Sequence, residues 1–276
     1  MRNHTDIPEL SSFNTFFRAW KVAVLMMIFM ISASFQIKAQ NKSYPFKPGE
    51  KLTYNMKFGW FNIGEAVVWL DPEFQYPKAK NQPHYKVQFT VATASWFKVF
   101  SKLSVCMESL IEADKLQPLR SDRDMEGKGK IDIRHDYFSY ADSISVKAYI
   151  EDIDEWRYHK FPSGNTPVRD ALSTYMWLRS RDKSQFTKTV EIRTFFSNDL
   201  YEFRMLPGKN TTHKYDNRKV RALEFGLDFP EGEYFDSGKT GKVIMSDDPN
   251  RYPLRLEIDM TVGSFVFDLE KVEYMD

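Results

Sequence analysis

The chain has 276 residues, of which 42% are hydrophobic, 28% charged and 16% aromatic, and its 39 basic residues nearly balance its 38 acidic ones. So many aromatic side chains exclude a low-complexity disordered chain. The near-zero net charge argues against a nucleic-acid partner, because a protein that neutralises phosphates needs a basic surface.

The amino terminus has the three parts of a secretory signal. Arg18 and Lys21 precede the apolar run 22–31, and a small alanine stands directly before the expected cleavage point. A membrane-spanning helix needs about 20 apolar residues, so this shorter run favours a cleaved signal over an uncleaved anchor. We expect a signal peptide over residues 1–39, cleavage before Gln40, a periplasmic or secreted protein, and no transmembrane span after cleavage.

Residues 40–276 have the length of a single domain. The one cysteine, Cys106, has no partner for an internal disulfide, so we expect a hydrophobic core to hold the exported fold. Because apolar residues surround Cys106 in the segment 103–107, a buried strand thiol is favoured over an exposed nucleophile.

Most of the chain after residue 40 alternates apolar and polar residues, which is typical of half-buried β-strands. The clearest alternating runs lie at residues 51–60, 84–91, 131–136, 144–150 and 254–260. Strands at this spacing, joined by short turns, predict a mainly β fold in which a single antiparallel curved sheet closes into a barrel or half-barrel. Within the last run, Ile258 is expected to be buried between the solvent-facing Glu257 and Asp259.

One segment departs from the period of two. Thr166 stands as a cap before Pro167 at the first helical position, which predicts a helix start, and Leu172 and Tyr175 then fall on one face. We expect one short helix over 167–181 that packs its apolar face on the sheet, exposes its polar face and covers one opening of the barrel.

Signatures of metal binding and catalysis are sparse. The histidines after residue 40 have no second His or Cys at ligand spacing, so we expect no metal and no other cofactor. No nucleophile elbow or zinc-protease motif is present. The segment 237–240 resembles a phosphate-binding loop only in its last residues, since Glu233 stands where the first glycine is required. We therefore expect a protein that is not an enzyme.

Two acidic stretches have simple structural interpretations. Residues 151–155 are expected to form a solvated strand edge rather than a calcium loop. Asp247 and Asp248, before Pro249, are expected to form a turn with side-chain-to-backbone hydrogen bonds. A hydrolase with dispersed acidic residues is an alternative, and it requires Asp247, Asp248 and a histidine to meet in one pocket.

Aromatic residues gather at two places. Residues 58–61 form the tip of an expected hairpin, and residues 96–100 follow a strand without clean alternation. Packing at the end of a barrel is one interpretation. An apolar cavity or a membrane-facing lip is the other, since exposed aromatic patches mark binding surfaces. With one tyrosine of the helix, the candidate ligand-binding residues are Trp60, Phe61, Trp96, Phe97, Phe100 and Tyr175.

Short motifs lie along the chain from the first strand to the last hairpin. In chain order they hold Tyr44, Gly49, Glu50, Leu52 and Tyr54, then Gly64 and Glu65, then Asp114 and Pro118, then Asp170, Leu172, Tyr175 and Arg179, then Ser246, Asp248, Arg251 and Pro253. Together these motifs resemble the bacterial domain of unknown function 3108 family. The resemblance implies an exported, largely antiparallel β-barrel of unassigned activity. A strongly curved sheet with one helix is also similar, at the level of the fold, to the periplasmic lipoprotein carriers of the LolA/LolB kind.

The favoured hypothesis is an exported, periplasmic, non-enzymatic protein that binds an apolar or lipid-like ligand within a curved sheet. The alternative is an envelope scaffold that binds a protein partner through a sheet edge. The hydrolase is the third and least favoured hypothesis.

Overall fold

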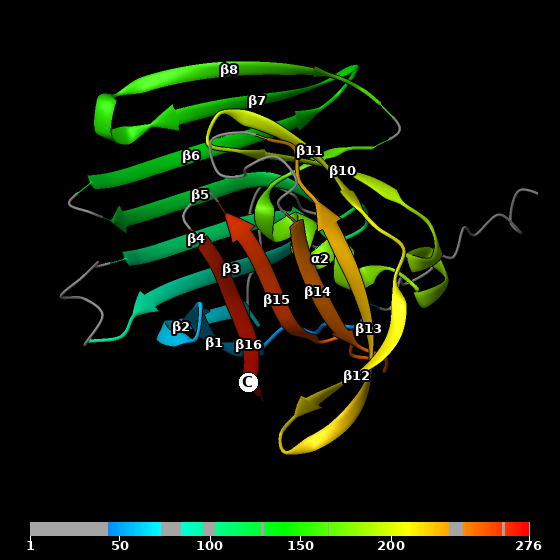
Figure 1. Cartoon of the computed structure of the whole chain (residues 1–276). Helices are drawn as coiled ribbons and strands as arrows, with labels where there is room; N and C mark the ends of the chain where they lie inside the picture. Colours follow the sequence, from blue (N-terminus) through cyan, green and yellow to red (C-terminus); the bar gives the residue numbers. More distant parts are fainter. Residues whose placement is uncertain are drawn as a thin grey trace, which may run out of the picture. The chain divides into compact units, whose positions relative to one another are not determined.

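The computed structural model describes residues 44–72, 84–95, 103–127, 130–164, 166–231, 240–260 and 263–275. The expected signal peptide, the candidate residues Trp96, Phe97 and Phe100, and most of the loop 237–240 lie outside this description. Strands make up most of the described chain (Figure 1), which confirms the mainly β fold.

The strands are β1 (Glu50–Phe58), β2 (Phe61–Leu70), β3 (His84–Thr93), β4 (Leu103–Glu112), β5 (Gln117–Gly127), β6 (Lys130–Tyr140), β7 (Ser143–Ile150), β8 (Glu155–Pro162), β9 (Val168–Arg169), β10 (Val190–Phe196), β11 (Asp199–Met205), β12 (Lys209–Tyr215), β13 (Arg218–Asp228), β14 (Thr240–Ser246), β15 (Pro253–Met260) and β16 (Gly263–Tyr274). The helices of the described chain are the α-helix α2 (Ala171–Ser180) and the short 3-10 helices η2 (Glu151–Ile153) and η3 (Lys183–Thr187).

All sixteen strands of the described residues belong to one sheet. Consecutive strands pair antiparallel from β2 to β8 and from β13 to β16. The strand β1 joins these two halves, because it pairs antiparallel with both β2 and β16. Among the described strands, only β9 and β10 form a parallel pair. Because β8 and β9 stand at the two ends of the strand order, the sheet is open, which confirms the half-barrel form of the prediction.

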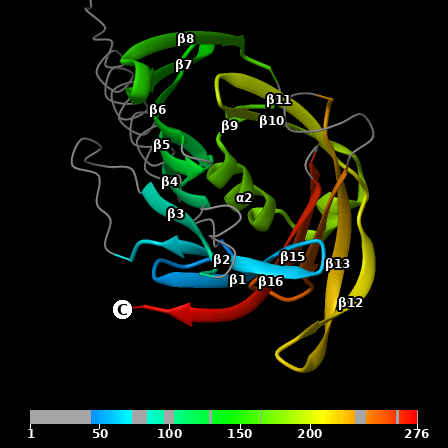
Figure 2. The same ribbon diagram turned by 60° about the vertical axis from the view of Figure 1, so that its left-hand side comes forward.

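The sheet curves around α2, which lies on its concave side (Figure 2). The two ends of the sheet meet through side chains. The ring of Phe195 in β10 lies 6.1 Å from the ring of Phe138 in β6 and 6.0 Å from that of Phe161 in β8. The guanidinium of Arg193 also donates to the main-chain carbonyl of Pro162 at 3.3 Å. Side-chain contacts, and not backbone pairing, therefore join the two ends.

The concave face of the sheet carries the core. Leu52, Val68 and Met107 lie in one row of directly paired positions across β1 to β4, and each is less than one tenth exposed. On the convex face of the same strands, Lys86 and Glu108 form an ion pair at 3.0 Å. The alternation seen in the sequence thus corresponds to the two faces of the sheet.

The helix differs from the prediction in its start and in its burial. Val168–Arg169, expected in the first turn, forms β9 and pairs with β10, and Asp170 rather than Thr166 caps the helix. Ser173 and Thr174 are buried, so the expected solvent-exposed polar face is wrong. The reason is that α2 lies inside the curve of the sheet, where β10 packs against it as well as β3 and β4.

Cys106 is exposed, so the expected buried thiol is also wrong. Val105 and Met107 take the inward positions of β4, and the residue between them must face outward. Partial desolvation, together with the charges of Asp124 and Glu108, raises the pKa of the Cys106 thiol. A raised pKa reduces the thiolate fraction, which is the nucleophilic form.

Candidate functional site

A cavity of about 480 Å³ lies between α2 and the concave face of the sheet. Along β15 it extends from Pro253 to Ile258, and Ile258, which was expected to be buried, lines this space and is only half-buried. The lining side chains, almost all apolar, are Tyr54, Val68, Phe89, Met107, Ala171, Leu172, Thr174, Tyr175, Leu178, Arg179, Thr194, Phe196, Phe203, Leu227, Val243, Met245, Pro253, Leu256, Ile258 and Phe267.

Buried polar contacts fix the first turn of α2. The Asp170 carboxylate accepts from the main-chain N–H of Ser173 at 2.7 Å, and the Ser173 hydroxyl accepts from the main-chain N–H of Asp170 at 3.1 Å, which is a reciprocal capping box. The hydroxyls of Thr174 and Thr194 in β10 lie 2.8 Å apart. Burial raises the pKa of Asp170, and the hydroxyls of Ser109 and Ser173 oppose that shift.

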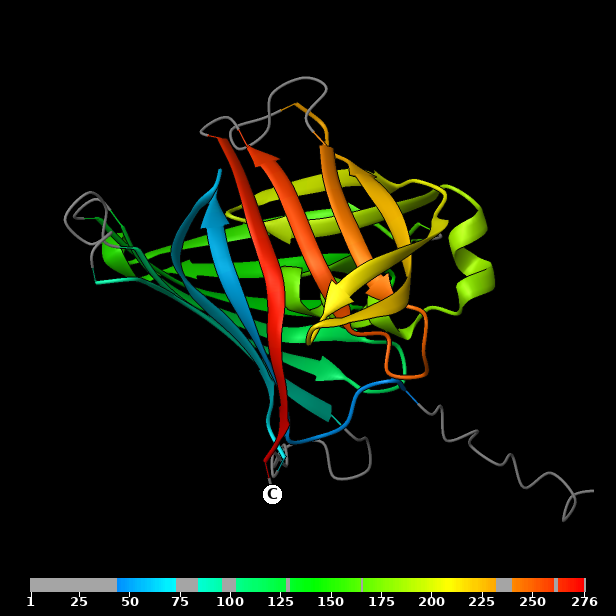
Figure 3. The same cartoon turned by 60° about the horizontal axis from the view of Figure 1, so that its bottom comes forward.

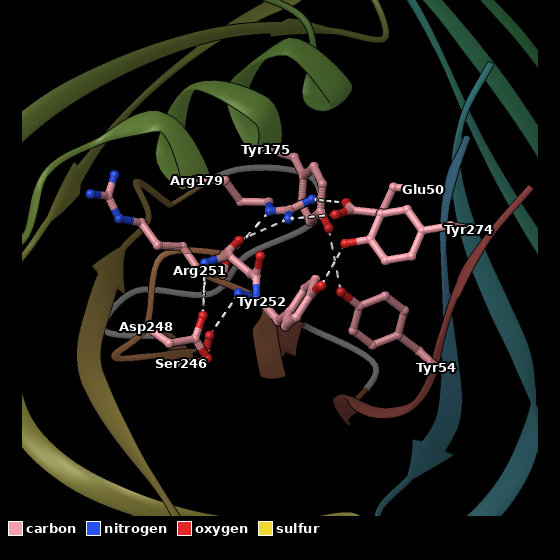
Figure 4. A network of polar contacts seen from close by, with 10 residues as sticks. Glu50, Tyr54, Tyr175, Arg179, Ser246, Asp248, Arg251, Tyr252 and Tyr274 are labelled. Atoms are coloured by element: carbon pink, nitrogen blue, oxygen red, sulfur yellow. Dashed lines mark hydrogen bonds and ion pairs between the residues drawn. The ribbon is translucent and has the colours of Figure 1, made fainter. Parts of the chain in front are cut away.

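A buried ion pair fixes the last turn of α2 (Figure 4). The side chains of Arg179 and of Glu50, the first residue of β1, are only 1% and 2% exposed. The guanidinium donates to both carboxylate oxygens of Glu50. It also donates to the main-chain carbonyls of Asn250 at 3.0 Å and Arg251 at 3.3 Å. This one side chain therefore links α2, β1 and the loop between β14 and β15.

Aromatic rings surround Arg179. Its guanidinium carbon lies 5.6 Å from the ring centre of Phe46, 5.8 Å from that of Tyr175 and 5.7 Å from that of Tyr252. Burial by itself would lower the pKa of Arg179, but Tyr175 and Glu50 raise it above its ordinary value. The guanidinium thus carries its positive charge inside the protein, where the carboxylate of Glu50 balances it.

The loop between β14 and β15 forms the expected turn. The Asp248 carboxylate accepts from the main-chain N–H groups of Asn250 at 2.8 Å and Arg251 at 3.2 Å, which confirms the prediction of side-chain-to-backbone hydrogen bonds. The Arg251 guanidinium donates to the main-chain carbonyl of Arg181 at 2.6 Å and to the Asp182 carboxylate at 2.9 Å. The turn is thereby attached to the segment that follows α2.

This network brings together residues from distant motifs, among them Glu50, Tyr54, Tyr175, Arg179 and Arg251. Glu50 and Arg179 are 129 positions apart in the chain. The sequence motifs contain these residues but do not indicate that they meet. The available signal was an arginine among the apolar residues of a short helix, since a buried charge requires a partner of opposite charge.

Two tyrosine hydroxyls stand where the network meets the cavity. The hydroxyl oxygens of Tyr54 and Tyr175 lie 3.4 Å apart, and both side chains line the cavity. Burial raises the pKa of each tyrosine, so both hydroxyls are protonated at neutral pH. They can form hydrogen bonds with a polar group of a ligand, but neither supplies a base.

The other candidate residues within the described chain lie apart from Tyr175. Trp60 and Phe61 occupy the tip of the β1–β2 hairpin, where they are 87% and 56% exposed, and neither lines the cavity. The apolar cavity beside α2 and the exposed aromatic tip are therefore two separate features of the structure.

The acidic residues of the hydrolase alternative have structural partners. Asp247 pairs with Lys183 at 2.7 Å, Asp248 holds the turn, and neither lines the cavity. Within the described ranges, no group of three or more His, Cys, Asp or Glu side chains could hold a metal ion. No helix in the same ranges is both long enough and apolar enough to cross a membrane.

One inward-facing carboxyl group outside the cavity has a shifted pKa. Burial raises the pKa of Asp136 in β6 to about 6, against the opposing charges of Arg123 and Arg134. Both arginines also donate to Asp132, at 2.9 Å and 2.6 Å. The two arginines therefore offset only part of the free-energy cost of burying the ionised carboxylate of Asp136.

Comparisons with known proteins agree with this fold. The family model described as "Protein of unknown function (DUF3108)" matches residues 53–270. Among solved structures, the chain is similar to a β-barrel-like protein of domain of unknown function DUF1849 from Brucella abortus, with a TM-score of 0.56 and 11% sequence identity over 85% of this chain and 100% of that chain. At this identity the likeness concerns the fold alone. A comparison with curated proteins finds no match.

Proposed function

We propose that this chain, which belongs to the DUF3108 family of proteins of unknown function, binds an apolar, lipid-like ligand between α2 and the curved sheet. The cavity itself carries the proposal: about 480 Å³ lined mostly by apolar side chains, with Tyr54, Tyr175 and Arg179 among the polar groups in its wall. Sites for small ligands usually measure about 300–1,000 Å³ and combine apolar walls with a few polar groups.

Packing energetics support a ligand rather than a permanent void. Protein interiors hold few spaces larger than a water molecule, because atoms that line an empty space lose dispersion contacts. Leu256, Ile258 and Phe267 all line the cavity and are only half-buried. Polar contacts near both ends of α2, between Thr174 and Thr194 and between Arg179 and Glu50, attach the helix to the sheet and oppose its movement into the space. An apolar ligand would bury these side chains and restore the missing contacts.

The proposed role is that of a non-enzymatic carrier in the periplasm or outside the cell. The signal-like amino terminus supports export. The polar groups of the cavity wall support binding rather than catalysis, because hydroxyls with raised pKa values are poor bases and nucleophiles. Carriers of the LolA/LolB kind provide a fold-level analogy for such a role.

A second candidate function is a scaffold, which the strand β8 favours. This strand stands at one end of the sheet and is exposed along most of its length, so a strand of a partner protein could pair with it. However, Arg157, Lys160 and Pro162 are the kinds of residue that protect sheet edges from pairing. We therefore place ligand binding first.

A binding titration with a fluorescent fatty acid tests the proposal. We expect one probe per chain to bind at micromolar protein concentration, with the increase in emission that follows transfer into an apolar site. Leu256→Trp should reduce this binding by about tenfold or more, because the larger side chain occupies the cavity.

Glu257→Trp is the matched control. Glu257 is the next residue of β15 and faces the opposite side of the sheet, where it pairs with Lys242 and Arg255. The proposal is wrong if the unchanged protein takes up no probe, or if both tryptophan variants bind it as well as the unchanged protein does.

A further inference from the structure

The tip of the β1–β2 hairpin exposes two large aromatic side chains. Trp60 is 87% exposed and Phe61 56%, and their ring centres lie 6.2 Å apart. The segment from Phe58 to Gly64 contains no charged residue, although 28% of the chain is charged. Exposed apolar groups on an uncharged tip of this kind mark an interaction surface.

Apolar side chains connect this tip with the cavity. Ile258 and Leu256, which line the cavity, are paired with Phe265 and Phe267 of β16, and Phe265 is paired with Phe58 of β1. The rings of Phe58 and Phe265 lie 5.1 Å apart. Figure 3 shows that the end of β1 (blue), the start of β16 (red) and the end of β15 (orange-red) lie side by side, at the same ends of these neighbouring strands.

A glycine allows the start of β16 to lie close to the ring of Phe58. Gly263, the first residue of β16, has φ +129°, and a Cβ atom there would lie 2.7 Å from the ring of Phe58. Only glycine permits this close approach without strain. The opposite end of the cavity holds the network around Arg179 and Glu50, so the apolar path leads away from the charged end.

We propose that Trp60 and Phe61 insert into the surface of a lipid bilayer and that ligand passes between the bilayer and the cavity over Phe58 and Phe265. This inference rests on the proposed function. A tryptophan suits the bilayer interface, because its ring is apolar and its indole N–H is polar. Lys57, the nearest cationic residue in β1, is already paired with Asp268 at 2.8 Å. Binding should therefore depend on apolar insertion, occur with uncharged lipid and be little affected by salt.

Flotation with phosphatidylcholine vesicles tests the inference. Each variant is purified from the cell that makes it, after any cleavage of the amino terminus, so that all variants begin at the same residue. The unchanged protein should float with the vesicles. The double variant Trp60→Ser, Phe61→Ser should lose about tenfold or more in vesicle affinity. Tyr158→Ser is the matched control, because Tyr158 is 72% exposed but lies in β8, away from the tip. Trp60→Phe should retain binding, while brominated acyl chains should quench less of its tryptophan emission than that of the unchanged protein.

A parallel titration with a fluorescent fatty acid in water separates this inference from the proposed function. The double variant should take up the soluble probe as the unchanged protein does, since neither residue lines the cavity. If the unchanged protein takes up the probe but does not float, or if the double variant floats equally well, the membrane inference is wrong and the proposed function stands. Capture of a stoichiometric protein partner at Trp60 without vesicle binding would also overturn it. Failure of the unchanged protein to take up the soluble probe would contradict the proposed function itself.

Discussion

Replacing Arg179 by methionine should destabilise the protein more than any surface substitution. The change removes a guanidinium that is 1% exposed and leaves the carboxylate of Glu50, 2% exposed, without its cation. Two main-chain carbonyls, of Asn250 and Arg251, also lose a donor. Removing one partner of a buried ion pair costs about 3–5 kcal/mol, a large share of the 5–15 kcal/mol that stabilises a typical domain.

Urea denaturation of Arg179→Met, Glu50→Gln and the double variant measures this cost. Each single change should lower the free energy of unfolding by about 3–5 kcal/mol, whereas the double variant should lose clearly less than their sum, because no buried charge is left unpaired. Arg204→Met is the control, since Arg204 pairs with Asp228 at the surface with its side chain 60% exposed, and it should cost at most about 1 kcal/mol. Equal losses at Arg179 and Arg204, or additive losses in the double variant, would refute the assigned role of the pair.

Three further predictions concern the helix and one buried acid. Leu172→Ala should lower the free energy of unfolding by about 2–5 kcal/mol in urea, because Leu172 is 5% exposed, and a loss below about 1 kcal/mol would contradict its place in the core. Tyr175→Phe removes one hydroxyl from the cavity wall and should change the dissociation rate of a bound fluorescent fatty acid while shifting the thermal midpoint little, so an unchanged rate would remove Tyr175 from the site. Asp136 has a folded-state pKa of about 6, above its ordinary value near 4, so its neutral form favours folding. Its contribution, about 3 kcal/mol, is complete below about pH 4 and is lost as the pH rises through about 6. Asp136→Asn should therefore flatten the stability curve between about pH 4 and 6, and an unchanged curve would show that another group titrates.

The strands could be predicted because the two faces of the sheet have different surroundings. The concave face packs on α2 and the cavity, and the convex face meets solvent, so apolar and polar residues alternate. The same rule, applied strictly to β4, would have placed Val105 and Met107 inward and Cys106 outward. The composition of the segment around Cys106 predicted a buried thiol instead, so the alternation of positions along the strand was the better guide.

The helix could be predicted only in part, because its start depends on contacts that are distant in sequence. Thr166 and Pro167 form a local start signal, but pairing of Val168–Arg169 with β10 shifts the start to Asp170. No local pattern indicates that α2 is enclosed by the sheet, so Ser173 was expected to be exposed. The same limit applies to the ion pair of Arg179 and Glu50, which the fold brings together from opposite parts of the chain.

An apolar cavity was one interpretation of the aromatic residues, but its extent and most of its lining could not be predicted from them. Ile258 has the inward position that alternation predicts, yet it is half-buried because the space in front of it is not filled by protein. A sequence indicates which face a side chain occupies, but the distance between facing layers depends on the packing of the whole sheet.

Native mass spectrometry of the protein, released from the cell that makes it without detergent, tests the central claim most directly. We predict a second mass, heavier by one lipid or fatty acid per chain, that disappears on activation and is strongly reduced in Leu256→Trp but retained in Glu257→Trp. A single ligand-free mass for the unchanged protein, or an adduct of equal abundance in both tryptophan variants, would contradict a ligand in the cavity.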